Sequence, residues 1–405
     1  MNPRTKNLIL FITLVVIGFV IWYIQLTKPA QVNVGGKEII LPNDSLSIDD
    51  TNATTTSEIG SSTPKTANQV NNSSASHDRT EIRAAKAKLY PRAKELEAIA
   101  GYINTPEFKL ADIVGKKVVL IDFWTYSCIN CLRTLPYVTT WYDKYKDQGL
   151  VIVGVHTPEF DFEKDYKNVS NATVRLGVKY PVVLDSSYGT WNAYQNRYWP
   201  REYLIDIDGF ISHDHIGEGS YDETERAIQA ALKERNQALG IQTAVSSGII
   251  APKDAVNMNG NVASPETYFG AARNEYLGNG KPSTSGSQTL ILPATGKINT
   301  LYLSGTWNFT NQSAANTSKN AKIVYKYSAK NLYFVASSDA GVKISITRDG
   351  KPLGAEKGAD VSADGTLLIK ENRLYKLIEG TDYSEHTIEI TIEKPGLNAY
   401  TFTFG

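Results

Sequence analysis

The chain has 405 residues, more than one hydrophobic core usually needs, so two folded domains with connecting segments are expected. Its 42 basic and 42 acidic residues cancel, and no polycationic stretch is present that would follow a phosphate backbone, so we expect no nucleic-acid partner. The only cysteines, Cys128 and Cys131, are three positions apart. A crosslink between them would close a very short loop and remove little chain entropy, so their spacing indicates chemistry rather than a structural disulfide.

Residues 1–28 are predicted to be an uncleaved membrane anchor. Arg4 and Lys6 precede an apolar run from Leu8 to Leu26, which at about 1.5 Å per helical residue nearly spans a hydrocarbon core of ~30 Å. A cleaved signal peptide is the alternative, but the run is long for one and no good cleavage site follows it. The basic residues favour a cytoplasmic N-terminus, so the rest of the chain is expected outside the cytoplasm.

Residues 29–90 are predicted to be a flexible stalk. Residues 41–77 consist largely of Ser, Thr, Asn and Ala with few large apolar side chains, and such a stretch buries too little surface to offset the entropy of ordering it. A helical stretch is expected from about Thr80 to Ile99, with Pro91 dividing or starting it.

Residues 91–236 alternate between short apolar runs and helix-forming segments. The runs Lys117–Phe123 and Leu150–Val155 are rich in β-branched residues, which is typical of strands buried on both faces. The other expected elements are helices at Leu132–Lys146, Glu163–Leu176 and Glu223–Arg235 and strands at Pro181–Leu184, Glu202–Asp206 and Phe210–His213. Strand–helix–strand first and hairpin–helix last is the order of an α/β thioredoxin-like sheet.

Residues 237–297 are rich in Gly, Ser, Asn and Pro and are predicted to be a linker. Residues 298–405 then carry about eight short alternating stretches separated by turn residues, with no convincing helix between them. The expected strands include Ile323–Tyr327, Leu332–Ala336, Val342–Thr347, Leu374–Ile378, Thr387–Ile392 and Ala399–Phe404. This pattern predicts an all-β sandwich of jelly-roll type.

The pair Cys128-Ile-Asn-Cys131 follows a predicted buried strand and begins a predicted helix. Free N–H groups and partial positive charge at a helix N-terminus stabilise a thiolate, so Cys128 is the expected nucleophile and Cys131, one turn later, the residue that resolves the mixed disulfide. Half of a zinc site is the alternative, but zinc usually needs four ligands and the chain has no further cysteine. We therefore predict neither a metal nor a cofactor.

The segment Asp122–Cys131 (DFWTYSCINC) resembles the thioredoxin active-site strand, and Pro136 matches that family's helix-kinking proline. By this resemblance Asp122 would accept and return the proton of Cys131, although an ordinary strand-edge Asp is the alternative reading. Pro200 would be the family's cis-proline, with a trans loop proline as the alternative. Trp199, which precedes it, and Trp124 would contact the substrate.

The resemblance extends to the TlpA/ResA family and, within it, to the extracytoplasmic part of DipZ cytochrome c biogenesis proteins. The supporting segments are GYINTPEF (101–108), DFWTYSCINCLRTLPY (122–137), GVHTPEF (154–160), GEGSYDETE (217–225), SPETYFG (264–270) and AYTFTFG (399–405). It implies a reductase in a bacterial cell membrane that acts on disulfides of exported proteins, including those of apocytochrome c. Because only one span is predicted, electrons would come from a separate CcdA/DsbD-like membrane protein. A disulfide oxidase is the open alternative.

Parts of the sequence resemble two other kinds of site. A peroxiredoxin needs P-x-x-x-T-x-x-C, and Ile121 occupies the proline position here. His213 and His215 alternate on one expected strand face and could suggest a metal, but no third ligand accompanies them. Two interpretations stay open for His156, which follows the second strand: it tunes the electrostatics of the site, or it is an ordinary loop residue.

The C-terminal region also resembles carbohydrate-binding modules, which makes cell-wall carbohydrate a second expected partner and a sugar-binding protein with a thioredoxin scaffold the rival function. Aromatic rings stack on sugar faces, and the candidates are Tyr302, Trp307, Tyr325, Tyr333 and Tyr375. Aromatic residues in β-sandwiches are more often core residues, so the sequence leaves both interpretations open.

Overall fold

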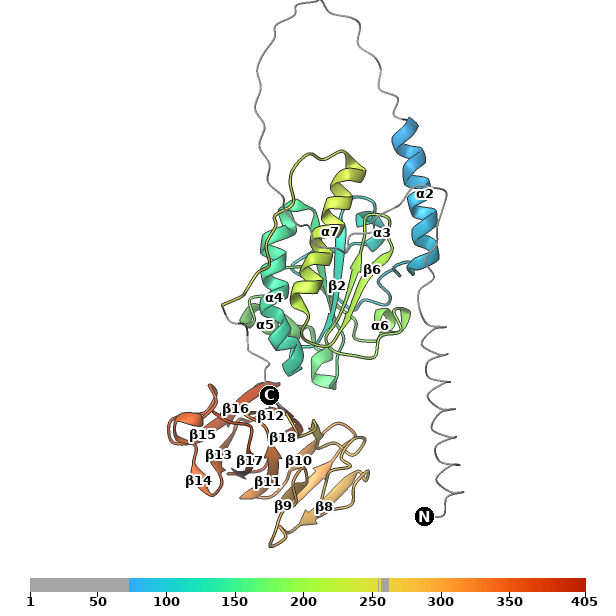
Figure 1. Cartoon of the computed structure of the whole chain (residues 1–405). Helices are drawn as coiled ribbons and strands as arrows, with labels where there is room; N and C mark the ends of the chain where they lie inside the picture. Colours follow the sequence, from blue (N-terminus) through green and yellow to red (C-terminus); the bar gives the residue numbers. More distant parts are fainter. Residues whose placement is uncertain (1–72, 254, 256–261) are drawn as a thin grey trace, which may run out of the picture. The chain divides into compact units, whose positions relative to one another are not determined.

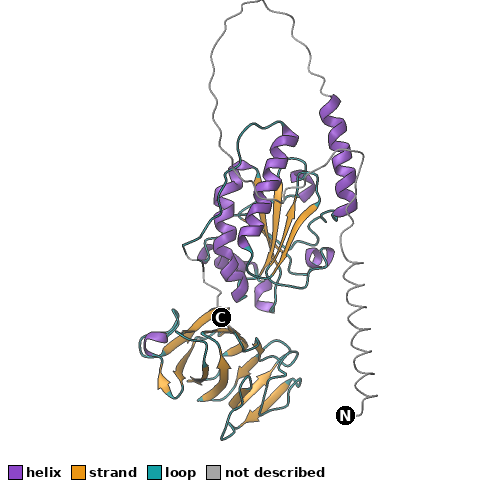
Figure 2. Cartoon of the chain, viewed as in Figure 1, coloured by secondary structure: helices purple, strands orange, loops and turns teal. Residues whose placement is uncertain are grey.

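The computed structural model describes residues 73–253, 255 and 262–405. Helices and strands alternate up to residue 239, and the part that follows is built of strands with one short 3-10 helix (Figure 2). The predicted anchor over residues 1–28 and most of the predicted stalk lie outside the described residues. Among the helices that the structure describes, none is both long and apolar enough to cross a membrane.

The first half contains a six-stranded sheet in the order β1-β4-β3-β2-β5-β6. Strands β2, β3 and β4 run parallel, while β5 and β6 form an antiparallel hairpin at one edge. All seven residues of β2 are buried, as its apolar sequence, interrupted only by Asp122, predicts. The strands are β1 Tyr102–Ile103, β2 Val118–Trp124, β3 Leu150–His156, β4 Val182–Leu184, β5 Arg201–Ile205 and β6 Ile211–Ile216.

Helices cover this sheet on both faces. Helices α4 and α7 pack on one face, where Leu135, Val138, Ile228 and Leu232 join a core cluster with Leu120 (Figure 1). A second cluster fills the opposite face. The helices are α3 Leu110–Ile113, α4 Ile129–Tyr145, α5 Tyr166–Arg175, α6 Gly189–Ala193 and α7 Tyr221–Leu239, with the 3-10 helices η1 Lys146–Gln148 and η2 Asp161–Lys164. This arrangement confirms the predicted thioredoxin-like fold.

One predicted helix is divided in the structure. The segment Glu163–Leu176 was expected to be a single helix, but η2 ends at Lys164 and α5 begins at Tyr166. Asp165 lies between them with an extended backbone, and its carboxylate accepts a hydrogen bond from the Asn168 N–H at 3.1 Å. An Asp in this position satisfies a free N–H of the first turn, so it starts a new helix rather than continuing the old one.

Helix α2 (Ser73–Leu89) lies within the segment predicted to be a flexible stalk. It ends before Pro91, and residues 91–99 are not helical, so the predicted helix up to Ile99 is wrong in its second half. Proline has no N–H and disfavours helical backbone in the residue before it, which explains the end of the helix.

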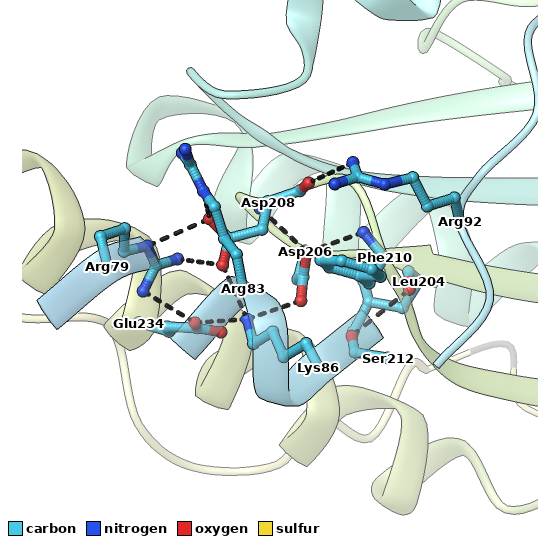
Figure 3. Close-up of polar contacts among 10 residues, drawn as sticks. All are labelled: Arg79, Arg83, Lys86, Arg92, Leu204, Asp206, Asp208, Phe210, Ser212 and Glu234. Carbon is cyan, nitrogen blue, oxygen red and sulfur yellow. Dashed lines mark hydrogen bonds and ion pairs between the residues drawn. The ribbon is translucent and has the colours of Figure 1, made fainter. Parts of the chain in front are cut away.

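Charged side chains hold α2 against the β5–β6 hairpin and α7 (Figure 3). Asp208, in the hairpin turn, has a fully buried side chain that accepts from Arg79 at 2.6 Å and Arg83 at 2.8 Å. Lys86 lies 2.7 Å from Asp206 and contacts Glu234 as well. Burial opposes ionisation of Asp208, but the hydrogen bonds from Arg83 and Lys86 outweigh it and lower the pKa of this carboxyl. We call this group of residues the α2 clasp.

The second half is a large antiparallel sheet of twelve strands. Its main pairing path is β14-β13-β17-β11-β9-β10-β18-β12-β16, with β7 on β18, β8 on β9 and β15 on β13. Side chains along β11 alternate between buried and partly buried, and the buried ones join a single core cluster. The strands are β7 Thr267–Tyr268, β8 Gly286–Leu290, β9 Leu301–Phe309, β10 Ala314–Asn316, β11 Ala321–Ser328, β12 Asn331–Ser337, β13 Val342–Arg348, β14 Lys351–Pro352, β15 Thr366–Ile369, β16 Arg373–Glu379, β17 Glu385–Ile392 and β18 Asn398–Phe404, with the 3-10 helix η3 Gly354–Glu356.

Two differences from the sequence analysis stand out in this half. Residues 237–297 were predicted to be a linker, but they contain strands β7 and β8. Both strands pair with other strands of the sheet, so this part of the segment belongs to the all-β half. The aromatic residues proposed for sugar stacking are packed inside instead of presenting exposed rings. Their exposed fractions are 6% for Tyr302, 0% for Trp307, 0% for Tyr325, 6% for Tyr333 and 1% for Tyr375.

Candidate active site

Cys128 is the N-cap residue of α4, at the carboxyl end of β2. Its backbone is extended, and its Sγ accepts a hydrogen bond from the Cys131 N–H at 3.4 Å. The side chain is half-buried, which leaves the sulfur within reach of another molecule. N–H groups of the first helical turn have no partner inside the helix and are suitable donors to a negatively charged sulfur.

Cys131 lies one turn into α4 and is 1% exposed. The two thiols are unpaired. Burial raises the pKa of the Cys131 thiol, and the neighbouring Cys128 and Asp122 raise it further. This sulfur therefore needs a nearby base before it can act as a nucleophile.

Asp122 is the candidate for that base. It lies in β2, is 2% exposed, and is close enough to Cys131 to influence the ionisation of the thiol. Burial raises the pKa of its carboxyl to about 7. Its Oδ1 has no hydrogen-bond partner among the described residues, so the carboxyl is free to take up a proton. It is a buried central-strand residue, not the strand-edge Asp of the alternative reading.

Trp199 and Pro200 directly precede β5, and Trp199 lies beside Cys128. The peptide bond between them is cis, as predicted. The Cys128 thiol is 4.0 Å from the Trp199 carbonyl oxygen, and the Trp199 indole N–H donates to the Thr157 carbonyl at 3.1 Å. The structure therefore places a backbone carbonyl beside the half-buried sulfur.

Trp124 does not have the position that a substrate contact would require. It is 0% exposed and belongs to the core cluster beneath α4, where its ring meets that of His156 edge-on at a centroid distance of 5.3 Å. Trp124 was predicted to contact the substrate and is near Cys128 in the sequence, but this nearness does not indicate whether the side chain is buried. We therefore assign Trp124 to the packing beneath the site and not to its surface.

The loop before Cys128 is held by groups that the sequence analysis did not identify. The carboxylate of Glu163, fully buried in η2, accepts from the Ser127 hydroxyl at 2.6 Å and from the Glu159 and Phe160 N–H groups at 2.6 and 3.0 Å. Burial raises the pKa of Glu163 to about 7. In the sequence, Glu163 is visible only as an acidic residue shortly after GVHTPEF. The sequence alone does not indicate that this residue binds Ser127.

His156 is also buried beneath the same loop. Its ring stacks on Tyr126 at a centroid distance of 5.5 Å, and its Nε2 lies 3.4 Å from the Thr125 hydroxyl. Burial lowers the pKa of His156 to about 3, so the ring is neutral at physiological pH. It supports the loop by packing and adds no charge to the site.

A cleft of about 270 Å³ opens at Cys128 between the two halves of the described chain. On its all-β side, Arg273 pairs with Glu159 at 2.7 Å, and the Tyr268 hydroxyl donates to the same carboxylate at 2.8 Å. The lining residues are Cys128, Ile129, Asn130, Glu159, Trp199, Val262, Ser264, Glu266, Tyr268, Arg273, Thr403 and Phe404. A larger hollow of about 430 Å³ beside α6 contains neither cysteine, so we do not connect it with the chemistry.

Comparisons with known proteins agree with this geometry. Residues 92–214 match the AhpC/TSA family, and residues 264–405 match the thioredoxin like C-terminal domain family. Protein DipZ of Mycobacterium bovis is 36% identical over 326 residues, which are 80% of this chain and 44% of DipZ. The chain thus spans less than half the length of that relative. The 326 aligned residues are more than either half of this chain contains, so the similarity includes parts of both halves.

Two shorter relatives match the first half. Thiol-disulfide oxidoreductase YkuV of Bacillus subtilis is 29% identical over 147 residues, which cover 36% of this chain and 98% of YkuV. Thiol-disulfide oxidoreductase ResA of Bacillus thuringiensis is 30% identical over 139 residues, which cover 32% of this chain and 75% of ResA. With Cys128 and Cys131 at the start of α4, the chain belongs to the thioredoxin-like family of ResA-type thiol-disulfide oxidoreductases.

Proposed function

We propose that the protein is a reductase of protein disulfides, with Cys128 as the attacking sulfur and Cys131 as the resolving sulfur. The observation that carries this proposal is the contrast between the two thiols. Cys128 is half-buried at the mouth of the cleft, whereas Cys131 is 1% exposed and lies close to a buried carboxyl. An accessible first sulfur and a shielded second one are what attack and resolution require.

The reaction follows from this arrangement. The Cys128 thiolate attacks a substrate disulfide, so that a Cys128–substrate bond forms and one substrate sulfur leaves as a thiolate. Cys131 then gives its proton to Asp122 and attacks Cys128 Sγ, which forms the intramolecular disulfide and releases the second substrate sulfur. The two electrons of the protein dithiol end on the substrate dithiol.

The cleft supports a proposal for how the substrate binds. A peptide that carries the disulfide would lie along the Trp199 carbonyl, which is close enough to Cys128 to pair with the backbone next to the substrate cysteine. Residues of the all-β half, such as Glu266 and Thr403, form part of the same cleft, so this half would take part in substrate selection.

We further propose that the protein acts outside the cytoplasm, held by an anchor over residues 1–28, and is reduced by a CcdA/DsbD-like membrane protein. Similarity to DipZ through both halves supports this placement, and apocytochrome c thiols are one substrate class that it suggests. Retention of the full-length chain in carbonate-washed membranes, with the cysteines accessible to an impermeant thiol reagent in whole cells, tests the location.

The activity is tested with a small disulfide-containing protein such as insulin. The reduced full-length chain should reduce it catalytically with a chemical reductant present, and Cys128→Ser should not. Cys131→Ser should instead accumulate a covalent complex that mass spectrometry detects through Cys128. If Cys131→Ser traps nothing while the parent oxidises reduced substrates efficiently, the protein is an oxidase and the proposed direction is wrong.

A further inference from the structure

A row of titratable side chains crosses three neighbouring strands beneath the active site. Asp122 on β2 is directly opposite Glu202 on β5, and Glu202 is directly opposite His215 on β6. Directly opposite side chains of antiparallel strands point to the same face, with Cβ atoms about 4.5–5.5 Å apart. On this face, Leu120 and Trp124 flank Asp122 and share a core cluster with Cys131. We call Asp122, Glu202 and His215 the acid row.

The middle member, Glu202, is buried where an ionised carboxylate has little support. It is 1% exposed, and neither of its oxygens makes a hydrogen bond of standard geometry to a described residue. Burial raises its pKa to about 8, and Asp122 adds to this, while the nearby Thr224 hydroxyl opposes it. An apolar side chain would pack better in this position than a carboxyl does, so packing alone does not explain why Glu202 is here.

The row continues in only one direction from Asp122. On its other side Asp122 faces Gly154 of β3, which has no side chain. A Cβ at Gly154 would lie 2.9 Å from Trp124 Nε1 and 2.9 Å from a ring carbon of Tyr180, so these rings close that side. A proton on Asp122 therefore has a titratable neighbour on the next strand only toward β5.

The other end of the row reaches the sheet edge. Strand β6 is an edge strand, and His213 and His215 on it are both partly buried. The Thr224 hydroxyl of α7, which lies near Glu202, is 3.2 Å from His213 Nε2. Burial and the adjacent His215 lower the pKa of His213, so its ring is mostly neutral at physiological pH and able to accept a proton. The Thr224 hydroxyl and the His213 imidazole thus lie between Glu202 and the sheet edge.

We propose that Glu202 relays the proton of Cys131 from Asp122 to the histidines of β6 and then to water. This inference rests on the proposed oxidoreductase function. When the mixed disulfide is resolved, Cys131 gives its proton to Asp122 and its sulfur bonds to Cys128, while the substrate thiolate leaves. Glu202, which is protonated near neutral pH, gives its proton to the Thr224 hydroxyl as that hydroxyl gives its own proton to His213, and Asp122 becomes ionised again by passing its proton to Glu202. In the reverse half-reaction the proton returns to the Cys131 thiolate.

Several groups lie around Glu202, and among them Asp122 and Thr224 act on its pKa. They are Asp122 of β2, His215 of β6, Tyr180 ahead of β4, and Tyr221 and Thr224 of α7, with Cys131 of α4 on the far side of Asp122. In the part of the chain that the structure describes, no Lys or Arg contributes to the pKa of Glu202. The row can therefore hold a mobile proton without a fixed counter-ion.

The test is a single-turnover measurement of mixed-disulfide resolution as a function of pH. The reduced full-length chain is mixed with a disulfide peptide, and release of the second substrate thiol is followed in water and in heavy water. Glu202→Gln should slow resolution about tenfold, less than the ~10²–10⁴-fold that a direct acid–base group contributes, and should enlarge the solvent isotope effect. Glu202→Asp should restore part of the rate.

The matched control is Glu225→Gln. Glu225 is a fully buried carboxylate of the same half, but Tyr145 and Lys144 donate to it and it lies outside the acid row. The Glu225→Gln substitution should leave the pH profile of mixed-disulfide resolution unchanged. An unaltered profile in Glu202→Gln, or equal slowing by Glu202→Gln and Glu202→Asp, would overturn the relay. Absence of any reversible Cys128–Cys131 disulfide would instead refute the proposed function.

Discussion

The two halves of the described chain differ in what they bury. In the first half, buried side chains include Asp122, His156, Glu163, Glu202 and Asp208. In the second half, the fully buried polar side chains within the described residues are only Ser, Thr and Asn. Burying an ionisable group costs several kcal/mol unless it is paired, so such groups remain where they have a role.

This difference separates a chemical half from a supporting half. Around the cysteines, buried carboxyls fix the loop before Cys128 and titrate beneath Cys131. The all-β half surrounds one apolar core and contributes side chains such as Tyr268 and Arg273 to one wall of the cleft. Substitutions in the first half should therefore change the chemistry, and core substitutions in the second should change stability.

The largest expected effect on the chemistry is that of Cys128→Ser. A serine hydroxyl is not ionised near neutral pH and cannot form a disulfide, so turnover should fall by at least about 10³-fold. Disulfide reduction by the full-length chain measures this, with circular dichroism as the control for folding. Substantial activity in Cys128→Ser would remove the central residue from the account.

The converse is tested by Trp307→Ala in the all-β half. Trp307 is 0% exposed, so its truncation should cost about 3–5 kcal/mol of unfolding free energy. Urea unfolding measures the loss. The reduction potential of Cys128–Cys131 in the folded variant should equal that of the parent. A shifted potential would show that the second half takes part in the chemistry.

The α2 clasp should respond to Asp208→Asn. The pKa of Asp208 is lowered in the folded state, so its contribution to stability is present above the ordinary Asp pKa of about 3.9 and is lost as the pH falls through the folded-state value. The variant should lose this contribution, and α2 amides should exchange faster in hydrogen-exchange mass spectrometry. Unchanged protection of residues 79–89 at neutral pH would show that the ion pairs do not hold the helix.

The smallest expected effect is a gain in stability from Glu202→Gln. Because burial raises the folded-state pKa of Glu202 to about 8, the folded state binds more protons than the unfolded state between roughly pH 4.5 and 8, and stability falls as the pH rises through this window. Removing the titration should stabilise the variant, and more at the alkaline end of this window than at the acidic end. Thermal unfolding at several pH values measures this, and a pH-independent difference would contradict the assignment.

Local patterns predicted much of the first half. The nearly continuous apolar runs predicted β2 and β3, and the motif around Cys128 predicted the start of α4. The cis bond before Pro200 was predicted from the resemblance to thioredoxin. The partner of Glu163 and the pairing of Asp122 with Glu202 could not be predicted, because both depend on the register between segments distant in sequence. The sequence around a charged strand residue does not indicate which residue of another strand it will face in the folded protein.

The second half was harder to bound. Strands β7 and β8 are short and lie among Gly, Ser and Pro, so their composition indicated a linker, whereas pairing with β18 and β9 makes them strands. Likewise, alternation identified Tyr325 as a strand residue but did not indicate which face is inside. Tertiary pairing, which the sequence pattern does not contain, decided both cases.

The most direct test of the account is the reduction potential of the Cys128–Cys131 couple in the full-length chain, measured by equilibration with a thiol–disulfide buffer. We predict a reversible two-electron couple near the thioredoxin value of about −270 mV, as a reductase requires. A value near about −120 mV would make the protein an oxidant and reverse the proposed direction of electron flow. Failure to form any reversible disulfide would contradict the assignment of this site as redox-active.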